Sequence, residues 1–432
     1  MDVIRECTEH LLLALGRMAL NPFYYIGIVF ITLQYRRQII LERKFFANRL
    51  RSLPREVFRM IAWGFLAGLI ASLIMSITGF KMNPQSGMLL GLITLILLFL
   101  RVRFLCLAYA AGVLGILRMA LSSIPGYDQT SGLAGWLSDA VMGSDLPSLF
   151  TLVAVLHLLE GGLILIQGNR LASPLFVESK RGKIVGAYHL QGFWPVPLFL
   201  IAPLSGGNFQ LTWQPLFSGN WQVSGWDLLV LPAVMGFSQM TLSFLPKAKL
   251  RQGAGLILVN GVFLLAGSVI TYYWSPFGWV VSVLSILMLE GIVWYGARLE
   301  RQRSPIFVNG KDGLKILAIL PGSAAEAIGL AVGESIYKVN GERVQTKEEL
   351  HMALRLNSAF CKLEVINLEG QNKFASHPLY EDQHHQLGLI LSPENTELFF
   401  LKERPFPISS YVRRKWMGVI HRGGVDLGNS GR

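Results

Sequence analysis

The chain has 432 residues, of which 52% are hydrophobic and only 15% are charged. Soluble proteins usually carry about 25% charged residues, so this composition excludes an ordinary soluble enzyme and a disordered chain. Lys and Arg are absent between Ile184 and Pro246 and between Gln252 and Ala297, whereas charged residues are frequent from Arg298 onward. We therefore expect a polytopic helical membrane domain over residues 1–300, followed by a soluble tail.

The net charge of +12 does not indicate nucleic-acid binding, because the basic residues lie in short stretches between apolar runs. That distribution is typical of the positive-inside rule for membrane proteins. The three cysteines, Cys7, Cys106 and Cys361, lack the spacing of a metal or redox motif. The sequence therefore predicts no nucleic-acid partner, no metal site and no cofactor.

Apolar runs define the candidate membrane spans, since a helix needs roughly 20 apolar residues to cross the bilayer core. Basic loops alternate along the chain with loops that lack Lys and Arg, such as 124–146 and 205–225. We expect 8–9 spans, with the basic loops and the tail in the cytoplasm. Eight spans remain if residues 3–20 form an interfacial amphipathic helix. The nine candidates are 11–33, 60–80, 86–100, 104–123, 147–167, 191–207, 226–246, 253–273 and 277–297.

The longest basic loop is residues 34–59, which mixes Arg and Lys with Phe45, Phe46 and Phe58. A basic stretch with interspersed aromatic residues is typical of a helix that lies on the anionic inner leaflet. A plain topology signal is the alternative, and both can hold.

Two segments of the chain match each other, which indicates an internal duplication of a membrane unit. The first segment contains Leu-Glu-Gly ending at Gly161, followed by Ser-Pro-Leu-Phe-Val over 173–177. The second contains Leu-Glu-Gly ending at Gly291, followed by Ser-Pro-Ile-Phe-Val over 304–308. Coincidence is the alternative explanation.

Three ionisable residues, His157, Glu160 and Glu290, fall inside apolar runs. Such groups are costly in a membrane, so a proton or ion site is one interpretation. The other is structural: each glutamate lies near the inner interface and pairs with Arg170 or Arg298, or caps the backbone of the Ser-Pro segment. The repetition of Glu, Arg and Ser-Pro in both segments favours the structural interpretation.

The tail has the pattern of a small α+β domain. Residues 306–308 and 314–320 predict a hairpin across a glycine-containing turn. Thr346 and Glu349 have the spacing of a capping box that opens a short helix over 347–356. Residues 363–366 predict a further strand.

The motifs of the tail, over residues 304–392, resemble a bacterial PDZ domain. They are Pro-Gly-Ser-Ala-Ala from Pro321, Gly329-Leu330, Gly333-Glu334 and Val339-Asn340-Gly341, before the helix. Ile328 and Glu334 stand where the family usually has Ala and Asp. Residues 387–390 resemble the carboxylate-binding loop, in the C-terminal position of the permuted PDZ domains of site-2 proteases.

The resemblance implies that a peptide binds as an added strand between that loop and the helix. The implied lining residues are Leu387, Gly388, Leu389, Ile390, His351 and Leu354. The loop lacks the family's first glycine, and a vestigial groove is the alternative. Residues 393–432 form a C-terminal extension with a basic-aromatic cluster, Arg413 to Trp416. We expect a solvated end, and contact with the membrane is the alternative.

An enzyme is not expected. A membrane zinc protease requires His-Glu-x-x-His, and the chain has His157 and Glu160 without a second histidine at that offset. A secondary transporter that uses the intramembrane glutamates, with a regulatory PDZ domain, is one alternative. A PDZ-containing membrane protease is a second.

A polytopic N-terminal region followed by one C-terminal PDZ domain resembles the layout of the MinJ family of Gram-positive division-topology proteins. The resemblance implies a membrane-anchored adaptor at division septa and poles. It implies protein–protein contacts with a DivIVA-like polar scaffold and a MinD-like ATPase, which together restrict FtsZ ring placement. It implies no catalytic residue.

Overall fold

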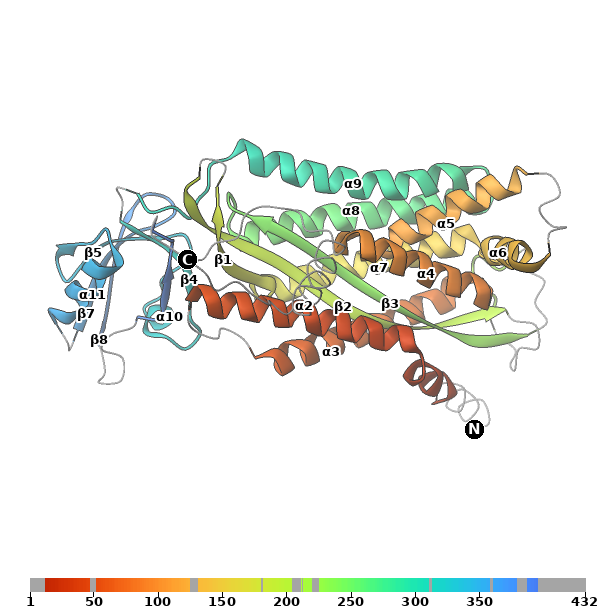
Figure 1. Ribbon diagram of the computed structural model, residues 1–432, viewed down its shortest axis with the longest axis horizontal. Helices are drawn as coiled ribbons and strands as arrows, with labels where there is room; N and C mark the ends of the chain where they lie inside the picture. The colour runs from red at the N-terminus through yellow and green to blue at the C-terminus, as the bar shows by residue number, and fades with distance from the viewer. Residues whose placement is uncertain are drawn as a thin grey trace, which may run out of the picture.

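The structure of the chain is a computed structural model. It describes residues 12–46, 52–124, 131–179, 182–203, 211, 213–219, 225–310, 313–357, 360–378 and 387–394. Figure 1 shows an elongated membrane region of helices and long strands, with the sheet-rich tail at one end of it.

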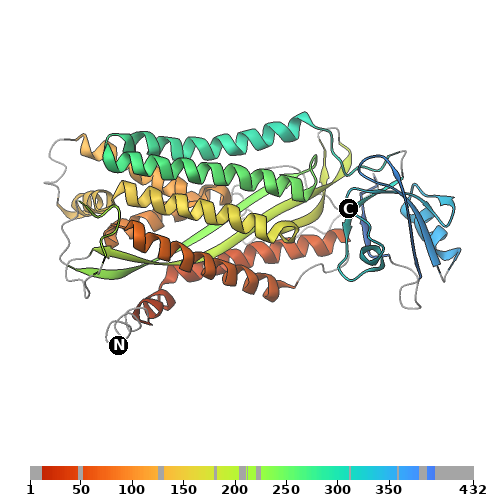
Figure 2. The ribbon, with the colours of Figure 1, turned by 180° about the vertical axis from the view of Figure 1, so that it is seen from behind.

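The described residues contain four helices that are long and apolar enough to cross a membrane. They are α3 (Leu53–Thr78), α7 (Leu146–Gln167), α8 (Pro246–Tyr273) and α9 (Phe277–Gln302). Seen from behind, α7, α8 and α9 lie side by side along the long axis (Figure 2). These helices match four of the nine predicted spans.

The first predicted span is a bent pair of helices, Leu12–Ala19 and α2 (Pro22–Phe46), which meet at 59°. The expected separate surface helix over 34–59 was wrong for residues 34–46, because they continue α2. Gln38 and Glu42 of this part are buried in a polar network with Gln191 and Ser173. These partners hold α2 against the sheet. Residues 47–51, and residues 3–11 of the alternative interfacial helix, lie outside the described residues.

Two predicted spans form a short helical hairpin. α4 (Pro84–Leu100) and α5 (Leu107–Ser122) are joined by the 3-10 helix η1 (Val102–Leu105). Each helix is about 25 Å long at 1.5 Å per residue, which is less than a bilayer core of about 30 Å. A further short helix, α6 (Gly132–Met142), precedes α7.

The helices predicted at 191–207 and 226–246 were wrong, because these runs form strands. β1 (Ala172–Glu178), β2 (Ile184–Pro203) and β3 (Trp226–Thr241) make an antiparallel sheet in that order. β2 and β3 run lengthwise through the bundle (Figure 1). β1 pairs only with residues 184–190 of β2, so the rest of that edge of β2 has no strand beside it.

The prolines of β2 explain why this run is a strand. Pro195, Pro197 and Pro203 are separated by even numbers of residues. Their backbone nitrogens therefore all face the same edge of β2, the one that β1 leaves open. Proline lacks an N–H group, so it is tolerated at a strand edge but disrupts a helix interior. The spacing therefore suits an edge and would break a spanning helix repeatedly.

Helix α3 covers the open edge of β2. A Cβ atom on Gly64 or Gly68 would clash with the backbone carbonyl of Pro195 or Pro197, respectively. One turn further, the Ser72 hydroxyl accepts a hydrogen bond of 2.9 Å from the Phe199 N–H. Glycine thus lets the helix approach, and serine satisfies a backbone donor that no strand reaches.

The tail forms a second sheet, with strand order β8-β7-β5-β4-β9 and β6 beside β5. Its predicted helix and the strand at 363–366 are confirmed. The elements are β4 (Leu314–Ile319), α10 (Ala324–Ala327), β5 (Ser335–Val339), β6 (Glu342–Arg343), α11 (Lys347–Arg355), β7 (Phe360–Ile366), β8 (Asn372–Pro378) and β9 (Leu389–Leu391).

The segment 306–308 joins the membrane region, so the predicted hairpin with 314–320 was wrong. Ile306 N–H donates to the Leu242 carbonyl, and the Phe307 carbonyl accepts from Gly186 N–H, both at 2.9 Å. On the opposite edge of β2, Phe176 pairs with Gly186. Phe176 and Phe307, the equivalent phenylalanines of the two matching segments, therefore lie on opposite sides of Gly186. The duplication stays a prediction.

Candidate functional site

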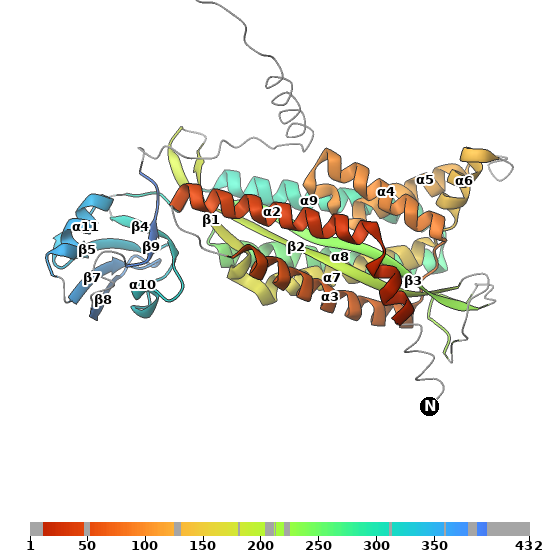
Figure 3. The same ribbon diagram turned by 60° about the horizontal axis from the view of Figure 1, so that its bottom comes forward.

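The candidate peptide site of the tail consists of the edge strand β9 and helix α11, two elements of the tail that Figure 3 labels. The start of α11 is fixed by the predicted capping box: the Thr346 hydroxyl accepts from Glu349 N–H, and Glu349 accepts from Thr346 N–H. Leu350, Ala353 and Leu354 are buried in the core of the tail. The helix is therefore held in a fixed position.

The loop before β9 is shaped by a glycine. Gly388 has φ = +73°, and a Cβ atom there would clash with the side chain of Ser323. The carbonyls of Leu387 and Gly388 accept hydrogen bonds from Ala325 N–H and Leu320 N–H. The loop is thus anchored by its carbonyl groups, which is the arrangement a carboxylate-binding loop needs to direct N–H groups outward.

The predicted lining residues separate into three environments. Leu389 is partly exposed beside the tail's core, and His351 is exposed. Leu354 and Leu387 are only 4% exposed, so they support the groove from beneath. Ile390 points to the other face of β9, as strand alternation requires, and belongs to the cluster of Leu317 and Phe307 at the membrane region.

Sequence reasoning missed two features of this site. Glu394, just after β9, accepts a hydrogen bond of 3.0 Å from Lys347 N–H at the start of α11. Lys347, His351 and Arg355 are four residues apart, so they share one flank of α11. The i, i+4, i+8 spacing was visible in the sequence. The contact of Glu394 was not, because it joins elements distant in the chain.

The tail also contacts the membrane region directly. The Tyr188 hydroxyl of β2 donates to the Leu317 carbonyl of β4, and the Tyr188 ring lies 5.4 Å from that of Phe307. A Cβ atom on Gly186 would press on both Leu317 and Phe307. β4 and β9 are neighbours, so the edge strand of the groove adjoins the end of the membrane sheet.

Glu290 is an ion-paired residue halfway along α9. Its carboxylate lies 3.0 Å from Arg103 and accepts a 3.1 Å hydrogen bond from the Tyr109 hydroxyl. The predicted partner Arg298 instead lies over the Trp294 ring, at 5.4 Å. The predicted Glu290–Arg298 pair was therefore wrong, and the carboxylate holds the tip of the α4–α5 hairpin against α9.

His157 and Glu160 lie on α7, both nearly fully buried. His157 Nδ1 donates to the Val153 carbonyl at 2.8 Å, and Nε2 lies 3.5 Å from the sulfur of Cys106. In the part of the chain that the structure describes, no ion pair joins Glu160 to its predicted partner Arg170; the Arg170 carbonyl accepts a hydrogen bond from Arg59. Among the described residues, no group of three His, Cys, Asp or Glu is placed to hold a metal ion.

Comparison with known proteins covers both parts of the chain. The PDZ domain family matches residues 315–366, which run from β4 to β7. The cell division topological determinant MinJ of Bacillus subtilis is 27% identical over 90% of this chain and 96% of its own length. The chain resembles MinJ along nearly its whole length, and it carries a PDZ domain. A probable MinJ of Lacticaseibacillus paracasei is 25% identical over 82% of this chain and 91% of its own.

The similarity to MinJ extends well beyond the PDZ match. Because it covers 90% of the chain, it includes most of the membrane region, where the motifs alone gave only a resemblance of layout. The PDZ match ends before β8 and β9, so the edge strand of the groove lies outside it. The pairing of β9 with β4 places that strand in the same sheet.

Proposed function

We propose that the chain is a membrane-anchored adaptor of cell division whose PDZ domain recruits division regulators. The observation that carries the proposal is the similarity to MinJ, because it spans the membrane region and the tail together. The relatives are named for cell division topology, and a PDZ domain is a peptide-binding module.

The distribution of basic residues supports a cytoplasmic PDZ domain. α3 begins, α7 ends, α8 begins and α9 ends at the end of the bundle that carries the tail (Figure 1). Basic residues gather at these helix ends. At the opposite end the charges of Arg17, Lys81 and Arg118 are offset by Asp139, Asp145 and Asp227. By the positive-inside rule, the tail end is the cytoplasmic one. The basic residues at the tail end are Arg55, Arg59, Arg170, Lys247, Lys249, Arg251, Arg298, Arg301 and Arg303.

The partners follow from the proposed family role. The membrane region places the protein at septa and poles through a DivIVA-like scaffold, and the cytoplasmic part recruits a MinD-like ATPase that restricts FtsZ rings. A ligand segment adds as a strand to the edge of β9, beside α11. His351 and Arg355, which are exposed on one flank of α11, favour a ligand with acidic side chains or a terminal carboxylate.

The test is imaging of a full-length fluorescent fusion in a Gram-positive rod that lacks its own homologue. We expect a septal and polar signal and rescue of normal cell length. A variant with His351→Ala and Leu389→Ala keeps membrane localisation but fails to recruit the MinD-like partner. Met352→Ala is the matched control, because Met352 is 61% exposed on α11, away from its buried face. A uniform membrane signal with no effect on cell length contradicts the proposal.

A further inference from the structure

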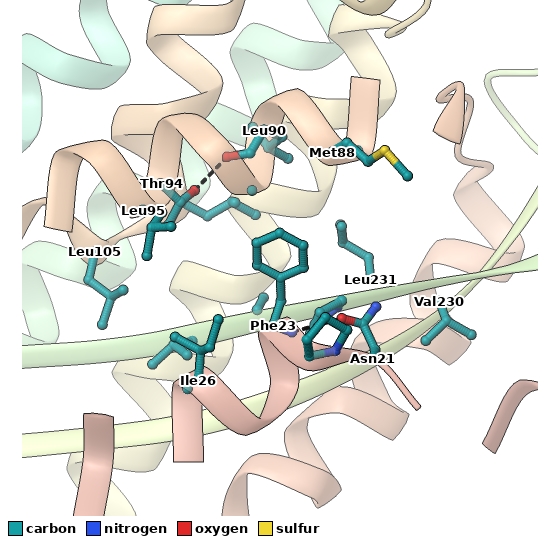
Figure 4. A pocket seen from close by; sticks show the side chains of 18 of the residues that line it. Asn21, Phe23, Ile26, Met88, Leu90, Thr94, Leu95, Leu105, Val230 and Leu231 are labelled. Carbon is teal, nitrogen blue, oxygen red and sulfur yellow. Dashed lines mark hydrogen bonds between the residues drawn. The ribbon is translucent and has the colours of Figure 1, made fainter. Parts of the chain in front are cut away.

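An apolar groove lies in the half of the membrane region away from the tail, between α2, α4 and β3. It has a volume of about 440 Å³, within the range of about 300–1,000 Å³ for ligand sites. Phe23 and Ile26 of α2, Leu90 and Leu95 of α4 and Leu231 of β3 line it, and Leu105 of η1 closes one end (Figure 4).

Two polar side chains of this groove already bond to the backbone of the protein. The Thr94 hydroxyl donates to the Leu90 carbonyl at 2.8 Å, and the Asn21 side chain accepts from Phe23 N–H at 3.0 Å (Figure 4). Away from Arg17 at one end, a polar ligand would therefore lose its hydration in the groove and gain few hydrogen bonds in return. The lining favours a hydrocarbon ligand.

The length of the groove matches a lipid tail. Its wall on α4 runs from Pro84 to Leu98, which is about 20 Å at the rise of an α-helix. One leaflet contributes about half of a bilayer core of about 30 Å. An acyl chain that enters from one surface therefore fits along the groove.

One end of the groove carries a charged residue. Arg17 lies before the 59° bend that precedes α2, and its side chain is 50% exposed. Its Nη1 atom contacts Asp227 at 3.2 Å and donates to the Leu228 carbonyl. A guanidinium carries five N–H donors, so the outward side of Arg17 can also bind a phosphate oxygen.

We propose that this groove holds one acyl chain of a bilayer phospholipid, with its phosphate at Arg17. The source is the surrounding membrane, because Phe23, Ile26 and Met88 are exposed on apolar helices: α2 belongs to a candidate span, and α4 is a shorter apolar helix. The site belongs to the outer leaflet if the tail is cytoplasmic. The lipid site itself does not depend on the division role.

Glycines of α4 offer a direct test. A side chain at Gly91 would project toward the Phe23 ring, 3.9 Å from the new Cβ atom, and a larger residue would occupy the groove. Gly87, one turn earlier, has only Met82 within 4 Å. Gly255 of α8 is exposed and has open space around its Cβ position, so Gly255→Leu is the matched control outside the groove.

The experiment is native mass spectrometry of the full-length protein, extracted from membranes in mild detergent. We expect one phospholipid per wild-type chain, identified by its mass and fragmentation. Gly91→Leu should reduce retention at least tenfold, whereas Gly255→Leu should retain lipid as wild type does. If the Gly91→Leu protein is not monodisperse, the Gly87→Leu variant is measured in its place, with the same tenfold loss of lipid retention expected. The proposal is overturned if the wild type carries no lipid, or if it carries only detergent or free fatty acid. It is also overturned if the groove variant and the control retain lipid equally.

Discussion

The Arg103 guanidinium lies 3.0 Å from the Glu290 carboxylate, although 187 residues separate them in the chain. The contact joins the tip of the α4–α5 hairpin to the middle of α9 and recruits the hydroxyl of Tyr109. The pair lets two short helices end inside the membrane region, because it neutralises a charge that would otherwise face hydrocarbon.

Replacement of Glu290 by Leu should destabilise the protein strongly. A charged Arg at the centre of a membrane helix costs about 2.5–3.5 kcal/mol, and Arg103, which is one-third exposed in η1, should bear part of that cost once Glu290→Leu removes its partner. The double variant Arg103→Leu and Glu290→Leu should recover much of the loss, because it removes both charges. Thermal unfolding of the full-length protein in detergent measures the three variants.

The double-mutant cycle separates pairing from simple burial. If the losses of the two single variants add up in the double variant, the residues do not interact and the hairpin tip is held by other contacts. Tyr109→Phe is the matched control, because it removes one hydrogen bond to Glu290 and leaves both charges in place.

The groove residues of the PDZ domain should divide into supporting and contacting positions. Leu354→Ala should cost about 2–5 kcal/mol of unfolding free energy, because Leu354 is 4% exposed in the core. His351→Ala should change stability by less than about 0.5 kcal/mol, because His351 is exposed. Thermal unfolding measures the stability of both variants, and a partner pull-down measures their binding. A His351→Ala variant that binds its partner as well as wild type would show that α11 is not part of the site.

Cys361 should resist alkylation in the folded protein. Burial raises the pKa of its thiol from 9.0 to about 11, so the thiolate, the reactive form, is scarce at neutral pH. We expect peptide mapping after iodoacetamide treatment to find Cys361 modified only once the chain is unfolded. Fast modification in the native protein would show that β7 is open at this position.

The same shift predicts a pH dependence of stability. Below pH 9 the thiol is protonated in both states, and its contribution to stability is fully present. Between pH 9 and about pH 11 the unfolded state ionises first, so stability falls over that window. The difference in unfolding free energy between wild type and Cys361→Ala isolates this effect from lysine titration, and a difference that is constant with pH contradicts it.

The sequence predicted the four long helices and α11, because their signals are local: apolar runs of spanning length and a capping box. It missed the membrane sheet, because β2 is buried on both faces and so shows a continuous apolar run rather than an alternation. The even spacing of Pro195, Pro197 and Pro203 was the available signal for an edge strand.

The contacts of the candidate site were less predictable than its elements. The lining segments of the groove came from a family resemblance, and the structure gave Leu389 and Ile390 opposite faces of one strand. The Arg103–Glu290 pair could not be predicted from spacing, because nothing local distinguishes Arg103 from Arg298 as the partner. Such choices depend on how helices pack.

The packing of α3 on the edge of β2 gives the sharpest test of the membrane sheet. Gly68→Ala should destabilise the protein, because the added methyl group clashes with the Pro197 carbonyl. Overpacking typically costs about 1–3 kcal/mol. An ordinary Gly to Ala change in a helix has the opposite sign and stabilises by about 0.5–1 kcal/mol. Gly162→Ala on α7, where a Cβ atom meets open space, is therefore the matched control. If thermal unfolding of the full-length protein shows both variants equally stable, α3 does not lie against a strand at residues 195–199.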